Sequence, residues 1–156
     1  MSSLKKDIKE SSDALVEALM HEHVYLDKSF ESLIDIDKFF NKHSKNGKPV
    51  RSGQLSQNLG AKMFSIAAYV GNCFVENIKG ARWVINDQDP EGKLNITVKF
   101  PDGGEIYPCR KVIKRLANGA EDSIYVYAHL IASKYIDFKF NEKYWSITNK
   151  KPWWKF

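Results

Sequence analysis

The chain has 156 residues and 17.9 kDa, the size of one domain that can bury enough surface to fold without disulfides or metal. A hydrophobic fraction of 43% and a charged fraction of 28% exclude intrinsic disorder. The longest run without a charged residue, Met63–Val75, is too short to span a bilayer, and the first residues contain no apolar signal region. Together with only two cysteines, this predicts a single cytoplasmic domain over residues 1–156.

The net charge of +5 is unevenly distributed along the chain. Residues 1–46 contain seven Lys and nine Asp or Glu, whereas residues 47–156 contain 17 Lys or Arg and ten Asp or Glu. The basic part permits an acidic protein, a nucleic acid or an anionic lipid as partner. No dense run of basic residues exists, so the pattern indicates nucleic-acid binding only weakly.

Apolar residues at helical spacing predict an N-terminal helical region over residues 11–46. Ser11–Asp13 offer N-caps, a break is expected near Tyr25–Ser29, and Asn46-Gly47 ends the region. Residues 45–53 are expected to form a loop.

A central helix is predicted over residues 54–79 from an apolar stripe with steps of three or four residues. Its small residues gather on a second face, where they would let another backbone approach closely: Gly60, Ala67, Ala68 and Gly71. The helix is therefore expected to be buried on two sides.

Residues 81–107 change to a period of two and predict a three-stranded antiparallel meander. The expected strands are 82–85, 94–100 and 105–107, joined by turns rich in Asp, Asn, Pro and Gly. In the middle strand the alternation points four residues to the core: Leu94, Ile96, Val98 and Phe100.

Two helices are predicted after the meander. Pro108 fits the first position of a helix over residues 109–117 that turns Val112, Ile113 and Leu116 inward, and residues 121–123 begin another that runs to about Tyr135. The predicted fold class is α+β, with helices packed on one small antiparallel three-stranded sheet in the order α-α-β-β-β-α-α.

The motifs of known catalytic and cofactor sites are missing from the sequence. The four histidines form no HExxH pattern, and no glycine-rich nucleotide-binding loop is found. Cys73 and Cys109 are expected to be small core residues, and a Cys109–His129 pair would lack a third, orienting group. The sequence therefore predicts no catalytic residue, no metal and no cofactor.

Aromatic rings and lysines alternate at the C-terminal end. We expect the rings to border a partner-binding surface and the lysines to rim it, because Trp and Tyr dominate binding hot spots. The candidate residues are Tyr144, Trp145, Lys150, Lys151, Trp153, Trp154 and Lys155. The alternative is that the rings fold back and complete the core.

Three stretches in the middle of the chain resemble a family of small bacterial domains of unknown function. They are Ile66-Ala-Ala-Tyr-Val-Gly-Asn72, Gly80-Ala-Arg-Trp83 and Tyr107-Pro108, and the match covers roughly residues 55–125. In that family a helix of the form L-G-x-Y-x-G-E precedes G-x-x-W, a β meander and a Pro that opens a helix. This chain departs from the pattern at residues 66–67 and at Asn72, where the family commonly has an acidic residue. The resemblance implies an α+β fold and a bacterial source.

Some proteins of this kind stand beside secreted toxins as immunity proteins, so the resemblance also favours a binding role. We expect a non-enzymatic protein-binding protein of a bacterium, an immunity or adaptor protein that occludes a protein partner. The alternative is a small nucleic-acid-binding factor or hydrolase that uses the basic C-terminal half.

Deleting Lys151–Phe156 separates the two interpretations of the C-terminal rings. If the rings dock a partner, the truncated protein keeps its melting temperature almost unchanged and loses its co-purifying partner. If the rings complete the core, thermal melting shifts down by several degrees, because losing two buried Trp costs on the order of several kcal/mol.

Overall fold

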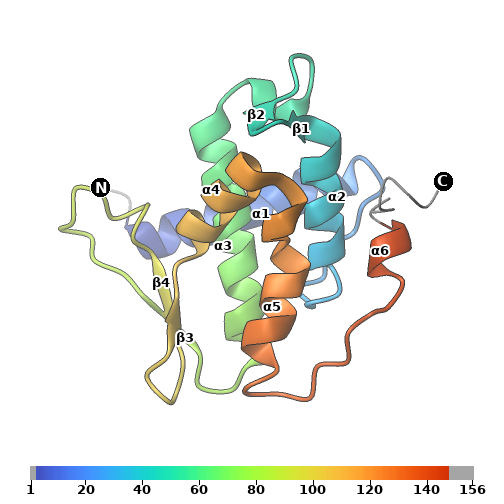
Figure 1. Ribbon diagram of the computed structural model, residues 1–156. Coiled ribbons are helices and arrows are strands. Elements are labelled where there is room, and N and C mark those ends of the chain that lie inside the picture. The colour runs from blue at the N-terminus through green and yellow to red at the C-terminus, as the bar shows by residue number, and fades with distance from the viewer. Residues whose placement is uncertain (1–2, 148–156) are drawn as a thin grey trace.

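The computed structural model describes residues 3–147 of the chain (Figure 1). Its helices are α1 (Leu4–Met20), α2 (Leu33–His43), α3 (Leu59–Asn77), α4 (Pro108–Asn118), α5 (Ile124–Ala132) and α6 (Tyr144–Ile147), with short 3₁₀ turns at Gln54–Ser56 and Gly119–Asp122. Its strands are β1 (Ser44–Lys45), β2 (Lys48–Pro49), β3 (Arg82–Val84), β4 (Thr97–Lys99) and β5 (Glu105–Ile106). The predicted α+β class is confirmed.

Helix α3 lies at the centre of the molecule, as its two-sided apolar pattern predicts. It packs most extensively against α1 and then against α4, and it also contacts β3 and β4. Helices α2 and α5 pack together beside it (Figure 1). Its residues from Ile66 to Gly71 are all buried.

Helix α1 begins earlier than the sequence suggested. The Ser3 hydroxyl caps it by accepting a hydrogen bond from the Lys6 amide at 3.2 Å, so the predicted caps at Ser11–Asp13 are wrong. Ser12 instead lies inside the helix, on a buried face shared with Ile8 and Leu15. The early start follows from the continuation of this apolar face back to Leu4.

The expected break in the N-terminal helical region exists and is wider than predicted. Residues 21–32 form turns between α1 and α2. The segment expected as a loop after α2 contains a small hairpin in which β1 pairs antiparallel with β2. Its two-residue turn, Asn46-Gly47, has φ angles of 54° and 78°, the positive values that tight hairpins require.

The predicted central helix is divided near its beginning. Asn58 adopts a left-handed conformation with φ of 53°, which separates the 3₁₀ turn at Gln54–Ser56 from α3. The small residues were expected to let another backbone approach α3 closely. At Gly71 it is the Trp83 indole that approaches, since a Cβ there would overlap this ring. That indole donates a hydrogen bond to Asn72 Oδ1 at 2.9 Å. Gly60, by contrast, faces open space.

The meander is confirmed as a sheet with strand order β3-β4-β5, antiparallel throughout. Ile96, Val98 and Phe100 are buried as the alternation predicts. Leu94 is 39% exposed, which corrects its assignment to the core. Strand β4 begins only at Thr97, and the turns before it are held by Asp89, which accepts hydrogen bonds from the Glu91 amide and from Asn95 Nδ2.

We expect Gly71→Ala to lower the free energy of unfolding by about 1–3 kcal/mol, because the new methyl group must displace the Trp83 ring. The matched control is Gly60→Ala on the same helix, where nothing lies within 4 Å of the new atom. This control should leave stability unchanged or raise it by up to about 1 kcal/mol. Urea denaturation measures both variants, and equal stabilities would contradict the packing described here.

Candidate functional site

The structure separates the C-terminal candidate residues into three groups. Tyr144 is completely buried and packs its ring against Tyr125 at 5.2 Å between centroids, so it lies in the core and not at a surface. This corrects its expected position at a binding surface. The ring can be buried because its hydroxyl has hydrogen-bond partners, Ser123 Oγ at 2.6 Å and Asp37 Oδ2 at 3.2 Å. Trp145 is 46% exposed and contacts Phe140. Lys150, Lys151, Trp153, Trp154 and Lys155 lie outside the described residues.

The partner of Tyr144 is a fully buried carboxylate on α2. Asp37 Oδ1 accepts hydrogen bonds from Arg115 Nε at 2.9 Å and from the Ile124 amide at 3.0 Å. Its Oδ2 accepts from Ser123 Oγ and from the Tyr125 amide, both at 2.9 Å. The Asp37 carboxylate thus lies against the N-terminus of α5, where the free backbone amides and the helix dipole stabilise a negative charge.

This buried network joins α2 to α4, α5 and α6. The Arg115 guanidinium, 2% exposed, also donates to the Asp37 carbonyl and to Asn41 Oδ1. Asp37 and Tyr144 have no exposed surface among the residues described. The sequence analysis did not single out Asp37 or Arg115, although Arg115 stands three residues after the inward-facing Val112.

Replacing Asp37 with Asn keeps the shape of the side chain, but one of its two acceptor oxygens becomes an NH₂ group that faces hydrogen-bond donors. The charge of Arg115 is then left unpaired. We expect Asp37→Asn to lower the free energy of unfolding by about 3–5 kcal/mol, and Tyr144→Phe by about 1–2 kcal/mol. Denaturant titration of the purified variants measures both.

Asp35→Asn on the same helix is the matched control. Burial is the main cause that raises the pKa of the Asp35 carboxyl above its usual value, so its charge does not favour the folded state. Neutralising it should therefore leave the free energy of unfolding at pH 7 unchanged or raise it slightly. Equal losses for Asp35→Asn and Asp37→Asn would show that the hydrogen bonds around Asp37 do not contribute to stability beyond the effect of removing any charge from α2.

Cys109 and His129 are not brought together as a catalytic pair. The Cys109 thiol donates to the Lys93 carbonyl at 3.1 Å, and burial raises its pKa to about 11, so it stays protonated at neutral pH. His129 lies between the rings of Phe138 and Phe140. Cys73 is completely buried, as expected. Within residues 3–147, no cluster of three or more His, Cys, Asp or Glu side chains could hold a metal ion.

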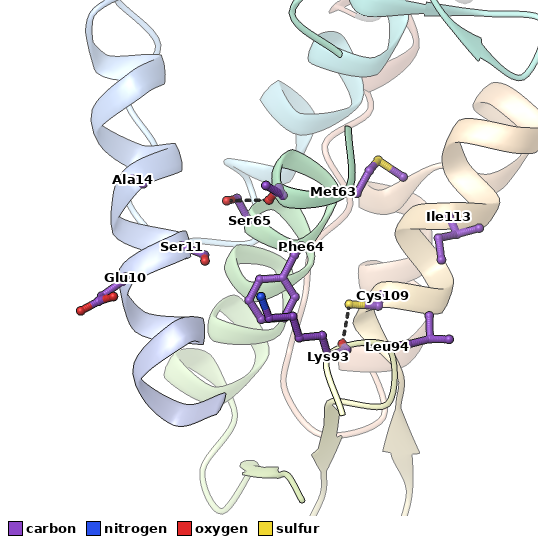
Figure 2. A pocket seen from close by; sticks show the side chains of 12 residues that line it. Glu10, Ser11, Ala14, Met63, Phe64, Ser65, Lys93, Leu94, Cys109 and Ile113 are labelled. Carbon is purple, nitrogen blue, oxygen red and sulfur yellow. Dashed lines mark hydrogen bonds between the residues drawn. The ribbon is translucent and has the colours of Figure 1, made fainter. Parts of the chain in front are cut away.

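An apolar groove of about 660 Å³ opens between α1, the start of α3 and the chain around β4 and α4. Figure 2 shows the side chains that converge on it from these three directions. Its lining consists of Glu10, Ser11, Ala14, Gly60, Ala61, Met63, Phe64, Ser65, Lys93, Leu94, Cys109 and Ile113. Most of these residues are exposed, so the groove is a furrow in the surface and not an enclosed cavity.

Two apolar residues that the sequence assigned to the core lie at the groove instead. Leu94 is 39% exposed and Ile113 is 46% exposed. Leu94 belongs to the turns before β4 and so has no place on the sheet face. Ile113 lies on the outer side of α4, because Cys109, Val112 and Arg115 occupy the buried side. The spacing of apolar residues predicts which side of an element is apolar, but it does not show whether another part of the chain covers that side.

Charged groups stand at opposite sides of the groove. Lys93 places its ammonium 5.2 Å from the centroid of the Phe64 ring, and Glu10 is 3.7 Å from the Lys6 ammonium one helical turn away. Among the described residues that line the groove, Glu10 carries the one carboxylate, and none is a histidine.

Comparison of the chain with protein-family models, with curated proteins and with solved structures finds no match in any of the three. The resemblance of residues 55–125 to small bacterial domains therefore stays a prediction. In the part of the chain that the structure describes, no helix combines the length and apolar character needed to cross a bilayer.

Proposed function

We propose that this protein is a non-enzymatic binding protein that receives an apolar segment of a protein partner in the groove between α1, α3 and α4. The observation that carries the proposal is the apolar lining around Phe64, extended outward by the exposed side chains of Leu94 and Ile113. Burying such side chains against a partner is favourable by about 25 cal/mol per Å² of apolar area.

The shape of the groove favours a protein segment over a small molecule. Small-molecule sites enclose most of the ligand surface, whereas Gly60, Ala61 and Ala14 leave this groove open along its length. Helix α1 stands on one side of it and the chain at Leu94 and Ile113 on the other, with α3 between them (Figure 2). An amphipathic helix laid in such a groove is a common mode of peptide recognition.

A protein that binds in this way would act as an adaptor or as an immunity-type inhibitor that occludes its partner. The resemblance to small bacterial domains supports a bacterial setting for this role. Trp145 remains a candidate for a second contact surface, since it is half exposed and stands on a ring cluster with Phe140.

A titration with a synthetic helical peptide tests the groove. The peptide carries leucines at spacings of three and four and uncharged polar residues elsewhere, and amide chemical shifts of the isotopically labelled protein are followed by NMR. We expect the shifts to concentrate at residues 10–14, 60–65, 93–94 and 109–113. Shifts centred on Trp145, or none at all, would overturn the assignment of the groove.

Gly60→Leu should block the groove without disturbing the core, because the glycine faces open space. We expect the affinity for the peptide to fall about ten- to hundredfold, the equivalent of one displaced apolar side chain. Ala117→Leu is the matched control, since it adds the same side chain at an exposed position of α4 outside the groove lining. Calorimetry measures both affinities, and equal losses in the two variants would contradict the proposal.

A further inference from the structure

His43, the last residue of α2, is buried and its ring accepts a hydrogen bond from the backbone of a later segment. The residue is 7% exposed, and its Nδ1 atom lies 3.1 Å from the amide nitrogen of Gln54. A backbone amide can only donate, so Nδ1 carries no proton and the neutral ring holds its proton on Nε2. This hydrogen bond therefore exists only while the ring is neutral.

Residues 50–58 lie directly against this histidine. The Val50 amide donates to the His43 carbonyl at 2.9 Å, and a Cβ at Gly53 would lie 3.1 Å from His43 Nδ1. Beside these contacts the side chain of Leu55 is completely buried. The segment thus closes over an apolar side chain, and the histidine ring supplies one of the polar contacts that keep it closed.

Gln54 connects the same segment to two further elements. Its side-chain amide donates to both oxygens of the Glu22 carboxylate, at 2.8 and 2.7 Å, in the turns after α1. Its backbone carbonyl accepts a hydrogen bond from the Lys62 ammonium on α3. The His43 ring, on α2, provides the third of these anchors. It is the anchor that a change of pH near neutrality can remove, because histidine alone among these groups has an ordinary pKa in that range.

Charged groups from three elements act on the His43 ring. Burial, the largest cause, and then the ammonium of Lys42 lower its pKa, the carboxylate of Glu22 opposes them, and Lys62 lowers the pKa again. Further charged or titratable side chains of the turn after α1, the hairpin and the loop are exposed to solvent: His21, His23, Lys45, Lys48 and Arg51. The result is a ring that is neutral at pH 7.

The direction of the pH dependence follows from this lowered pKa. In an open segment the histidine has its ordinary pKa of about 6.5, so it binds a proton more readily than the closed ring does. Acid therefore favours the open form. The closed form has its full stability above a pH of about 6.5 and loses it as the pH falls toward the lower pKa of the closed ring.

We propose that His43 is a pH-sensitive latch, which holds residues 50–58 against α2 while its ring is neutral and releases them when Nδ1 gains a proton. A proton on Nδ1 sets one hydrogen-bond donor against another, the Gln54 amide. Release exposes Leu55 beside the start of α3, where Gly60 and Ala61 line the groove. The latch acts on the segment itself, so this inference does not depend on the proposed function.

Hydrogen exchange of the whole labelled protein, followed by NMR, tests the latch. The protection factor of the Gln54 amide is compared at about pH 7.5 and about pH 5.5, above the ordinary pKa range of carboxyl groups. We expect it to fall about three- to tenfold at the lower pH, because a difference of one pKa unit between the open and closed forms changes the opening by up to about tenfold. The Phe100 amide, which donates to the Gly104 carbonyl at 2.7 Å, should keep its protection.

Two variants identify the histidine responsible. His43→Asn keeps an acceptor oxygen near the position of Nδ1 and does not titrate, so the protection of Gln54 should no longer depend on pH. The matched control replaces the two exposed histidines on either side of Glu22, His21→Asn together with His23→Asn. It should keep the pH dependence of the unchanged protein.

Three results would overturn the latch. The first is equal protection of Gln54 at both pH values, and the second is a loss at Phe100 as large as that at Gln54, which would mean that the whole protein unfolds. The third is a pH dependence that disappears in the control variant. If His43→Asn does not fold, the unchanged protein decides at lower pH: the fall in Gln54 protection must level off where the His43 ring titrates, and a fall that continues below that pH would contradict the latch.

Discussion

The buried ion pair between Asp37 and Arg115 organises much of this structure. Two opposite charges in a protein interior are stable only when further hydrogen bonds satisfy both groups, and the surroundings of Asp37 do this completely. The carboxylate receives the first amides of α5, the Ser123 hydroxyl and the guanidinium of α4, while Tyr144 reaches it from α6. One side chain of α2 thereby fixes three elements that follow it by more than seventy residues.

The same pair, together with the buried Cys109 and Val112, accounts for which side of α4 faces solvent. Residues two apart on a helix differ by about 200° in direction, so turning Arg115 inward toward Asp37 turns Ile113 outward. The observed burial agrees, with Arg115 at 2% exposure and Ile113 at 46%. The exposure of Ile113 at the groove is thus linked to an interaction in the core.

The sequence predicted the elements that have a clear period and failed where polarity was a poor guide to burial. The helices around residues 59–77 and 108–118 and the antiparallel meander were found because apolar spacing of three to four or of two residues is a strong signal. Tyr144 was expected at a surface and the burial of Arg115 was not foreseen, since a hydroxyl or a charge is buried only when distant partners satisfy it. Leu94 and Ile113 were assigned to the core, since the sequence does not show what covers an apolar side chain.

The groove itself depends on a contact between two segments that the sequence does not connect. The amide of Leu4, the first residue of α1, donates to Asp87 Oδ1 at 2.7 Å, and a Cβ at Gly92 would come within 2.8 Å of Leu4 Cδ1. Helix α1 carries one wall of the groove, and the turns that begin at Asp87 lead to Lys93 and Leu94 on the other wall. For the proposed function this contact matters because walls that are already tied together lose little conformational entropy on binding, which would raise the affinity that a modest apolar area can supply.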